Sequence, residues 1–172
     1  MNHYAGQMYL DHGGRHYNFA KYLNHYDYKP VIFCANQKMN PTNEQCIETN
    51  DLWIENNAEE IDVPFVFVRV RKYLGNGMQR VLNMCDYYRN VKRTAIQYSE
   101  MHGKPDVIMA SSVHPLTMIA GIQLAQRFRV KCICEVRDLW PEAIVTYSNK
   151  IMKNSMLARI CISEIFAFSS GS

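Results

Sequence analysis

The sequence lacks the short motifs that identify several common protein classes. It has no G-x-G-x-x-G and no P-loop, which argues against a dinucleotide or NTP site of the usual kind. Its six cysteines include no C-x-x-C pair, so we predict neither a metal site nor a disulfide framework. We expect reduced, mostly buried thiols of a cytoplasmic protein, with no cofactor.

Long hydrophobic runs and targeting signals are also missing. No apolar run approaches the ~18–20 residues that a spanning helix needs, and residues 1–4 have neither the basic nor the apolar region of a signal peptide. With 8 Gly, 6 Pro and 48% hydrophobic residues among 172, the composition is that of one globular domain. We predict a cytoplasmic protein that lies peripherally on the inner face of the cell membrane.

Charge is low but unevenly distributed. The net charge of +3 is too small to indicate a nucleic-acid partner. Between residues 69 and 93, however, seven basic residues face one acid, Asp86. Such a stretch can lie on anionic lipid, and a solvated helix face is the alternative. The candidate membrane contacts are Arg69, Arg71, Lys72 and Arg80.

Strand and helix patterns alternate along the chain, which predicts an α/β fold: a Rossmann-like parallel sheet with helices on both faces. Strands are predicted at 31–35, around Trp53, and at 63–70, 106–111 and 130–136; helices at 14–27, 78–101 and 114–129. Residues 1–150 should form this domain, and 151–172 a helix with a frayed tail. Apolar spacing predicts an inward face for each of the first two helices. The residues are Phe19, Leu23 and Tyr26 in the first helix, and Met78, Val81, Leu82, Cys85, Tyr88, Ala95, Tyr98 and Met101 in the second.

Polar residues follow several of these strands, where ligands bind in open parallel sheets. The first group is Gly13, Gly14 and Arg15, which open a helix. Bare amides at a helix start can approach a phosphate. A plain loop turn is the alternative.

The second group, Ser112, His114 and Thr117, follows the strand at 106–111. His114 begins a helix, whose positive end should keep the imidazole neutral. The two hydroxyls can bind sugar hydroxyls. The alternative is a capping serine beside a partly exposed histidine.

The third group follows the strand at 130–136 and contains Arg137, Asp138, Trp140 and Glu142. Charged residues at the end of a buried strand are costly unless they are paired or used. Arg137 could contact a phosphate and Trp140 a sugar ring. A structural ion pair beside a packed Trp is the alternative.

Several stretches together resemble the N-terminal half of a bacterial family-4 glycosyltransferase of the O-antigen or capsule type. These are Asn2-His3-Tyr4-Ala5-Gly6, Gly75-Asn76-Gly77 with Arg80 and Asn83, Asp106-Val107-Ile108 with Ala110-Ser111-Ser112-Val113-His114-Pro115-Leu116-Thr117, and Glu135-Val136-Arg137-Asp138-Leu139-Trp140-Pro141-Glu142. The last two are the most specific, and the resemblance covers about residues 1–160.

The resemblance implies a GT-B fold, in which two Rossmann-like domains face each other across a cleft. It implies retaining transfer of a sugar from a nucleotide-sugar donor to a lipid-linked acceptor, without a metal. His114 and Asp138 would be catalytic. Substrate would be bound by Gly13, Gly14, Arg15, Ser112, Thr117, Arg137, Trp140 and Glu142.

Two departures from the family shape this expectation. The family's first strand has several apolar residues before the Asn-His-Tyr stretch, whereas Met1 directly precedes Asn2 here, so this central strand should be short or absent. The C-terminal donor domain is absent, so the 172 residues should be inactive alone. Alternatives are an interaction subunit of a split enzyme and a free-standing nucleotide-binding Rossmann module.

Overall fold

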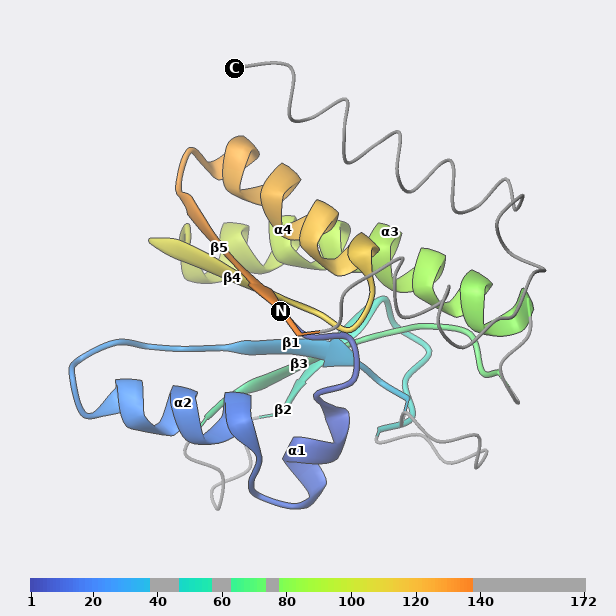
Figure 1. Cartoon of the computed structure of the whole chain (residues 1–172), viewed down its shortest axis with the longest axis horizontal. Helices are drawn as coiled ribbons and strands as arrows, with labels where there is room; N and C mark the ends of the chain where they lie inside the picture. The colour runs from blue at the N-terminus through green and yellow to red at the C-terminus, as the bar shows by residue number, and fades with distance from the viewer. Residues whose placement is uncertain (38–46, 57–62, 74–77, 138–172) are drawn as a thin grey trace. The chain divides into compact units, whose positions relative to one another are not determined.

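The computed structural model describes residues 1–37, 47–56, 63–73 and 78–137 as a mixed α/β structure (Figure 1). The chain divides into two compact units, Met1–Glu135 and Val136–Ser172. Of the second unit only Val136 and Arg137 are described, so the predicted helix at 151–168, the tail and the boundary at 150 lie outside these residues. The elements are α1 (Gly6–Leu10), α2 (Arg15–Asn24), β1 (Ile32–Ala35), β2 (Trp53–Asn56), β3 (Phe65–Val68), α3 (Met78–His102), β4 (Val107–Ser112), α4 (Pro115–Phe128) and β5 (Lys131–Val136).

The strands lie where the sequence predicts them and form two small sheets. In the first, β1 and β3 are parallel, with Ile32 opposite Phe65, and β2 is antiparallel to β3, with Trp53 opposite Val68. In the second, β4 pairs with β5, and α4 connects them along the chain. The prediction of a parallel sheet is therefore wrong for β2, which is antiparallel to its neighbour.

Residues 1–3 connect the two sheets through backbone hydrogen bonds. On one side, Met1 N donates to Met109 O (2.6 Å) and Ser111 N to Met1 O (3.0 Å), the pattern of a parallel pair. On the other side, Asn2 N donates to Phe33 O (3.0 Å) and Ala35 N to His3 O (2.9 Å). The central strand expected to be short or absent is therefore this short segment, which lies between β1 and β4.

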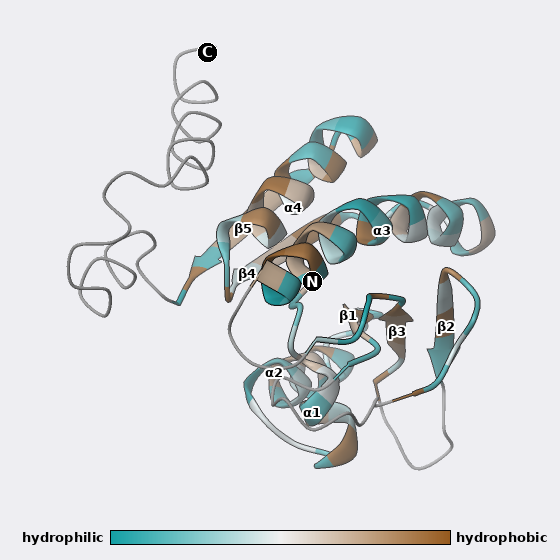
Figure 2. Ribbon diagram, turned by 90° about the vertical axis from the view of Figure 1, so that its right-hand side faces the viewer, coloured by the Kyte–Doolittle hydropathy of each residue, from teal (hydrophilic) through white to brown (hydrophobic). Residues whose placement is uncertain are grey.

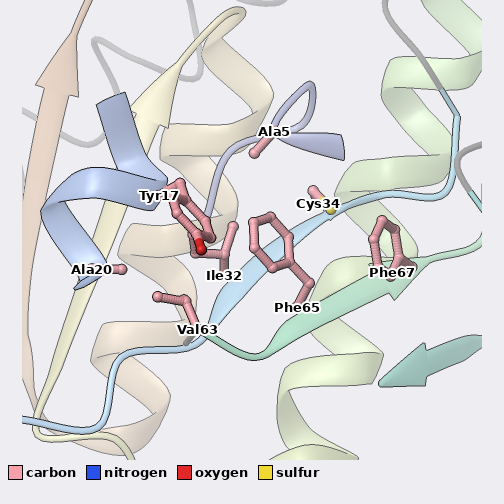
Figure 3. Packing of buried hydrophobic residues seen from close by; sticks show 8 residues of the cluster. All are labelled: Ala5, Tyr17, Ala20, Ile32, Cys34, Val63, Phe65 and Phe67. Carbon is pink, nitrogen blue, oxygen red and sulfur yellow. The ribbon is translucent and has the colours of Figure 1, made fainter. Parts of the chain in front are cut away.

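Helices cover both faces of the β1–β3 pair because its strands are apolar on both sides. On one face, Cys34 and Phe67 belong to a cluster with Ala5, Tyr17 and Ala20 of the α1–α2 region (Figure 3). On the other face, neighbouring strand residues, Ala35 and Val68, pack with Tyr87 and Val91 of α3. The alternation follows from the two-residue period of a strand.

The predicted inward face of α2 is wrong. Its buried residues are His16, Tyr17 and Ala20, whereas Phe19 and Tyr26 are 48% and 57% exposed. Tyr17 and Ala20 fit against the strand pair, and His16 is buried because it has a partner, described below. Hydrophobic spacing selected the side of the helix with more rings, although aromatic rings are common on protein surfaces.

The predicted inward face of α3 is correct for Ala95, which is buried, but wrong at the two ends of the helix. Met78 and Met101 are 64% and 67% exposed, and the buried residues are Asn83, Met84, Tyr87, Val91, Thr94 and Ala95. Figure 2 shows both polar and apolar colours along α3, as expected of a helix with one buried side. The buried side includes Asn83 and Thr94, which a count of apolar residues leaves out.

Gly121 lets α4 approach β4 closely. A Cβ atom on Gly121 would lie 2.5 Å from Cβ of Ala110 in β4, and 3.6 Å from Sγ of Cys132 in β5. A separation of 2.5 Å is too short for two non-bonded carbon atoms, so a side chain at this position would push α4 away from β4. Glycine therefore sets the packing distance of this β-α-β segment.

We predict that Gly121→Ala lowers the free energy of unfolding by about 1–3 kcal/mol, the usual cost of overpacking. A loss of stability would indicate the close contact, because replacing glycine by alanine in a helix otherwise stabilises it by ~1 kcal/mol. Adding Ala110→Gly should recover part of the loss, and Gln126→Ala, at an exposed position of the same helix, should be nearly neutral. Urea unfolding followed by circular dichroism measures the free energy of unfolding of the parent and of the three variants. A Gly121→Ala protein as stable as the parent would contradict this packing.

Candidate functional site

Two buried histidines meet where residues 1–3 and β4 end. His3 is the last residue of the central segment, and His114 is the N-cap residue of α4, just before Pro115. Nδ1 of His3 and Nε2 of His114 are 2.6 Å apart, and the two residues are 0% and 1% exposed. The structure thus joins positions 111 residues apart in the sequence, and His114 is buried, in contrast to the partly exposed alternative.

Aromatic stacking fixes the ring of His3. It lies between Tyr4 and Tyr87, with ring centroids 4.3 Å away on each side and interplanar angles of 12° and 5°. Tyr87 is itself held by a hydrogen bond from its hydroxyl to Phe33 O (3.0 Å). The His114 ring stands nearly perpendicular to His3, at 87°. The orientation of this histidine pair is therefore set by packing.

Both histidines are neutral near pH 7. Burial, with the charge of Arg80, lowers the pKa of His114 to about 3. Burial and the neighbouring His114 hold the pKa of His3 well below its ordinary 6.5, although the Asn83 side chain acts in the opposite direction. The sequence predicted a neutral His114, but burial is the main cause. The site can offer neutral imidazole nitrogens to a ligand.

Glu135, near the end of β5, connects this strand to the glycine loop. Its carboxylate lies 2.6 Å from Arg15 Nη2 and 2.9 Å from His16 Nε2. Nδ1 of His16 lies 3.3 Å from the amide of Asn2. Burial alone would raise the pKa of Glu135, but the hydrogen bond with His16, the nearby Ser111 side chain and the charges of His16 and Arg15 lower it. The carboxylate therefore stays ionised and ties three chain segments together.

The backbone conformation of the glycine loop explains why residue 14 is glycine. Gly14 is the N-cap residue of α2 with φ of 98°, a conformation that favours glycine. A Cβ there would also lie 3.0 Å from Cγ of Met8. Gly13 N donates to Met8 O (3.2 Å) and is thereby engaged within the protein. The loop turn is thus a sufficient explanation of the glycines, while Arg15 reaches the site through Glu135.

The remaining predicted residues fall into two groups. Ser112 ends β4 and Thr117 lies in the first turn of α4, and both are buried. Thr117 Oγ1 has no hydrogen-bond partner among the described residues. Arg137 is exposed just after β5. The predictions for Asp138, Trp140 and Glu142 lie outside the described residues.

Sequence reasoning did not select several residues that the structure places here. They are Asn2, His3, His16, Asn83 and Glu135. The Asn2-His3-Tyr4 stretch had been noted, but nothing local marks His16 or Glu135 as partners. In the described part of the chain, no group of three or more His, Cys, Asp or Glu side chains is arranged to hold a metal ion.

The basic stretch is partly neutralised. Arg71 pairs with Asp86 through Nε–Oδ2 (2.5 Å) and Nη2–Oδ1 (3.0 Å), and an Arg69 guanidinium nitrogen donates to Asn50 O. Arg80 is half-buried and acts on both histidines. No helix within the described ranges is long and apolar enough to cross a bilayer.

Comparison with known proteins gives no family assignment. No protein-family model, curated protein or solved structure matches this chain. The functional interpretation therefore rests on the residues and on their geometry.

We predict that acid destabilises the protein through the two histidines. Their folded-state pKa values lie below the ordinary 6.5, so the unfolded chain binds protons that the folded chain does not. Stability is complete above about pH 6.5 and falls as pH decreases below it, by up to ~1.4 kcal/mol per pH unit for each histidine. Urea unfolding at about pH 7, 6 and 5 gives the slope. His114→Gln should reduce it and the exposed control His25→Gln should not; equal slopes in all three would refute the assignment.

Proposed function

We propose that this chain is the Rossmann-like, acceptor-side domain of a GT-B glycosyltransferase that resembles family 4. The reaction would be retaining transfer of a sugar from a nucleotide-sugar to a lipid-linked acceptor in surface polysaccharide biosynthesis. Two contacts support the proposal. Glu135 of β5 pairs with Arg15 and His16, which follow the glycine loop, and His3 contacts His114 in a buried position.

The chemistry of these groups suits a polar, hydroxylated ligand. His114 and Thr117 carry buried polar atoms, Nδ1 and Oγ1, that lack hydrogen-bond partners among the described residues. Buried polar atoms usually have partners, so such atoms are candidates for ligand contacts. Arg80 adds positive charge beside them, and charge of that sign stabilises a departing diphosphate. Asp138, Trp140 and Glu142 are assigned to the same site by the resemblance alone.

The proposal divides the work between two domains. The domain described here would hold the acceptor, and a second Rossmann-like domain would hold most of the nucleotide-sugar. We therefore expect these 172 residues to bind nucleotide-sugars weakly and to be inactive alone. Of the predicted membrane contacts, exposed Arg69 and Lys72 are the better candidates, because Arg71 is paired with Asp86 and Arg80 lies beside the histidines.

We predict that the chain binds nanodiscs that carry a polyprenyl-diphosphate-linked sugar more tightly than the same nanodiscs without it. His114→Gln should weaken the difference by at least about tenfold, or ~1.4 kcal/mol. The matched control is Arg127→Gln, an exposed position in the last turn of α4. Binding is measured by biolayer interferometry, and circular dichroism checks folding. Equal binding to loaded and empty nanodiscs would refute acceptor recognition.

Two further titrations separate the alternatives. Tight NADH binding, followed by fluorescence, would indicate a free-standing dinucleotide module. Sugar transfer from UDP-sugars by the chain alone would refute the division of work between two domains.

On empty anionic nanodiscs, the double variant Arg69→Glu/Lys72→Glu should bind more weakly than the control Lys104→Glu/Arg127→Glu, which changes exposed positions elsewhere. Equal effects would remove Arg69 and Lys72 from the membrane contact.

A further inference from the structure

Two cysteine side chains of β5 converge on one side of the strand. The Sγ atoms of Cys132 and Cys134 are 3.8 Å apart. Side chains two residues apart in a strand point to the same side. The absence of a C-x-x-C pair led us to expect no metal site, but on a strand it is the C-x-C spacing that brings two thiols together.

One of the two sulfurs is held by the core and the other is open to solvent. Cys132 is partly buried and packs against the cluster that includes Ile108 and Leu124. Its Sγ also lies beside α4, because a Cβ atom on Gly121 would be only 3.6 Å away. Cys134 is exposed. A small ion can therefore reach the pair from the side of Cys134.

The separation of the two sulfurs fits a bridge of one metal atom. Zinc binds thiolates at ~2.3 Å in tetrahedral geometry, which places two sulfurs on one ion ~3.8 Å apart. The sulfurs of Cys132 and Cys134 already have this separation of 3.8 Å. An ion can thus be bound without a movement of the strand.

A direct disulfide fits this pair less well. It requires the sulfurs at ~2.05 Å and the Cβ atoms at ~3.8 Å. Side chains two residues apart in a strand start from Cα atoms ~6.4–6.8 Å apart and stand roughly parallel. Closing a disulfide would therefore bend β5, whereas a metal bridge would not.

Without an ion, the pair is held by a weak contact that involves a thiol. Burial and the neighbouring Cys134 raise the pKa of Cys132 to about 11, although the amino group of Met1 acts in the opposite direction. Cys132 is therefore protonated at pH 7, and a thiol is only a weak hydrogen-bond donor. A bound metal ion displaces such a proton, because a coordinating thiol is deprotonated outright.

We propose that Cys132 and Cys134 form a two-thiolate site for a thiophilic metal ion of the zinc class. The ion replaces the thiol protons, which pass to solvent. The two sulfurs occupy two of the four tetrahedral positions, and water or a donor atom of another molecule completes the shell on the exposed side. This site is separate from the proposed glycosyltransferase function and does not depend on it.

The ligand set determines which ions the site prefers and how tightly it holds them. Thiolates select zinc and similar ions, whereas magnesium and calcium prefer oxygen ligands. Among the residues with assigned positions, no third His, Cys, Asp or Glu joins the two sulfurs. We therefore expect weaker binding than at a four-cysteine structural site, and an ion that exchanges with the solution.

The test is titration of the reduced full chain with Cd²⁺, whose bonds to thiolates give a charge-transfer absorption in the ultraviolet. We expect one Cd²⁺ per chain, displaced by Zn²⁺ and unaffected by excess Mg²⁺. Loss of an outer hydrogen bond at a metal site costs ~10–100-fold in affinity. Losing a ligand costs more, so Cys132→Ser and Cys134→Ser should each weaken binding by at least about tenfold.

A matched control removes two other thiols. The double variant Cys46→Ser/Cys161→Ser changes positions outside the described residues and should bind Cd²⁺ like the parent, whereas Cys132→Ser/Cys134→Ser should lose the absorption. Circular dichroism checks folding, and Cys134→Ser keeps the test informative because that position is exposed.

Three results would overturn the proposal. The first is binding that is equal in the parent and in Cys134→Ser. The second is a loss of binding in Cys46→Ser/Cys161→Ser as large as in Cys132→Ser/Cys134→Ser. The third is a disulfide between Cys132 and Cys134 that forms readily when the folded chain is treated with diamide, located by mass spectrometry of its peptides, because it would contradict the spacing argument.

Discussion

Residues 1–3 form backbone hydrogen bonds with β1 on one side and with β4 on the other, and the rest of the structure depends on this double pairing. It joins two small sheets into one continuous set of hydrogen-bonded strands. Met1 and Phe33 pack against two hydrophobic clusters, one that includes Tyr87 and Val91 of α3 and one that includes Ile108 of β4 and Leu124 of α4. Because Asn2 and His3 belong to this segment and Tyr4 follows it, the segment also places polar and aromatic side chains near the strand ends.

The candidate site combines buried polar groups with an ionised carboxylate. Near the end of β4, neutral His3 and His114 lie in an aromatic environment. Near the end of β5, Glu135 remains charged because Arg15 and His16 compensate for its partial burial. A buried polar group is costly without a partner, so the histidines and Thr117 are where a bound ligand would be stabilised. Glu135 is paired with Arg15 and His16 and so connects β5 to the start of α2.

Prediction from the sequence was accurate for the positions of the strands and less so for burial and partners. The strand at 130–136 was expected to be buried, whereas Ile133 and Val136 of β5 are 54% and 57% exposed. A strand such as β3 is apolar on both sides, so its buried character is evident from its residues alone. For the helix predicted at 14–27, the rings of Phe19 and Tyr26 suggested an inward face, whereas Tyr17, Ala20 and the polar His16 of α2 are buried. The burial of His16 depends on Glu135, which is 119 residues away. Local periodicity carries no information on such a contact.

The order of strands and helices, the mixed α/β class and the start of a helix just after His114 could all be predicted from the residues alone. These features depend on short-range rules: the period of apolar residues, the restricted backbone of proline and the short loops between elements. Packing of the whole chain was needed to establish which helix faces are buried, that Gly121 sets the distance between α4 and β4, and that His3 contacts His114. The reason is physical: these outcomes depend on atoms brought together from positions far apart in the chain, where shape, burial and charge compensation select one partner among many.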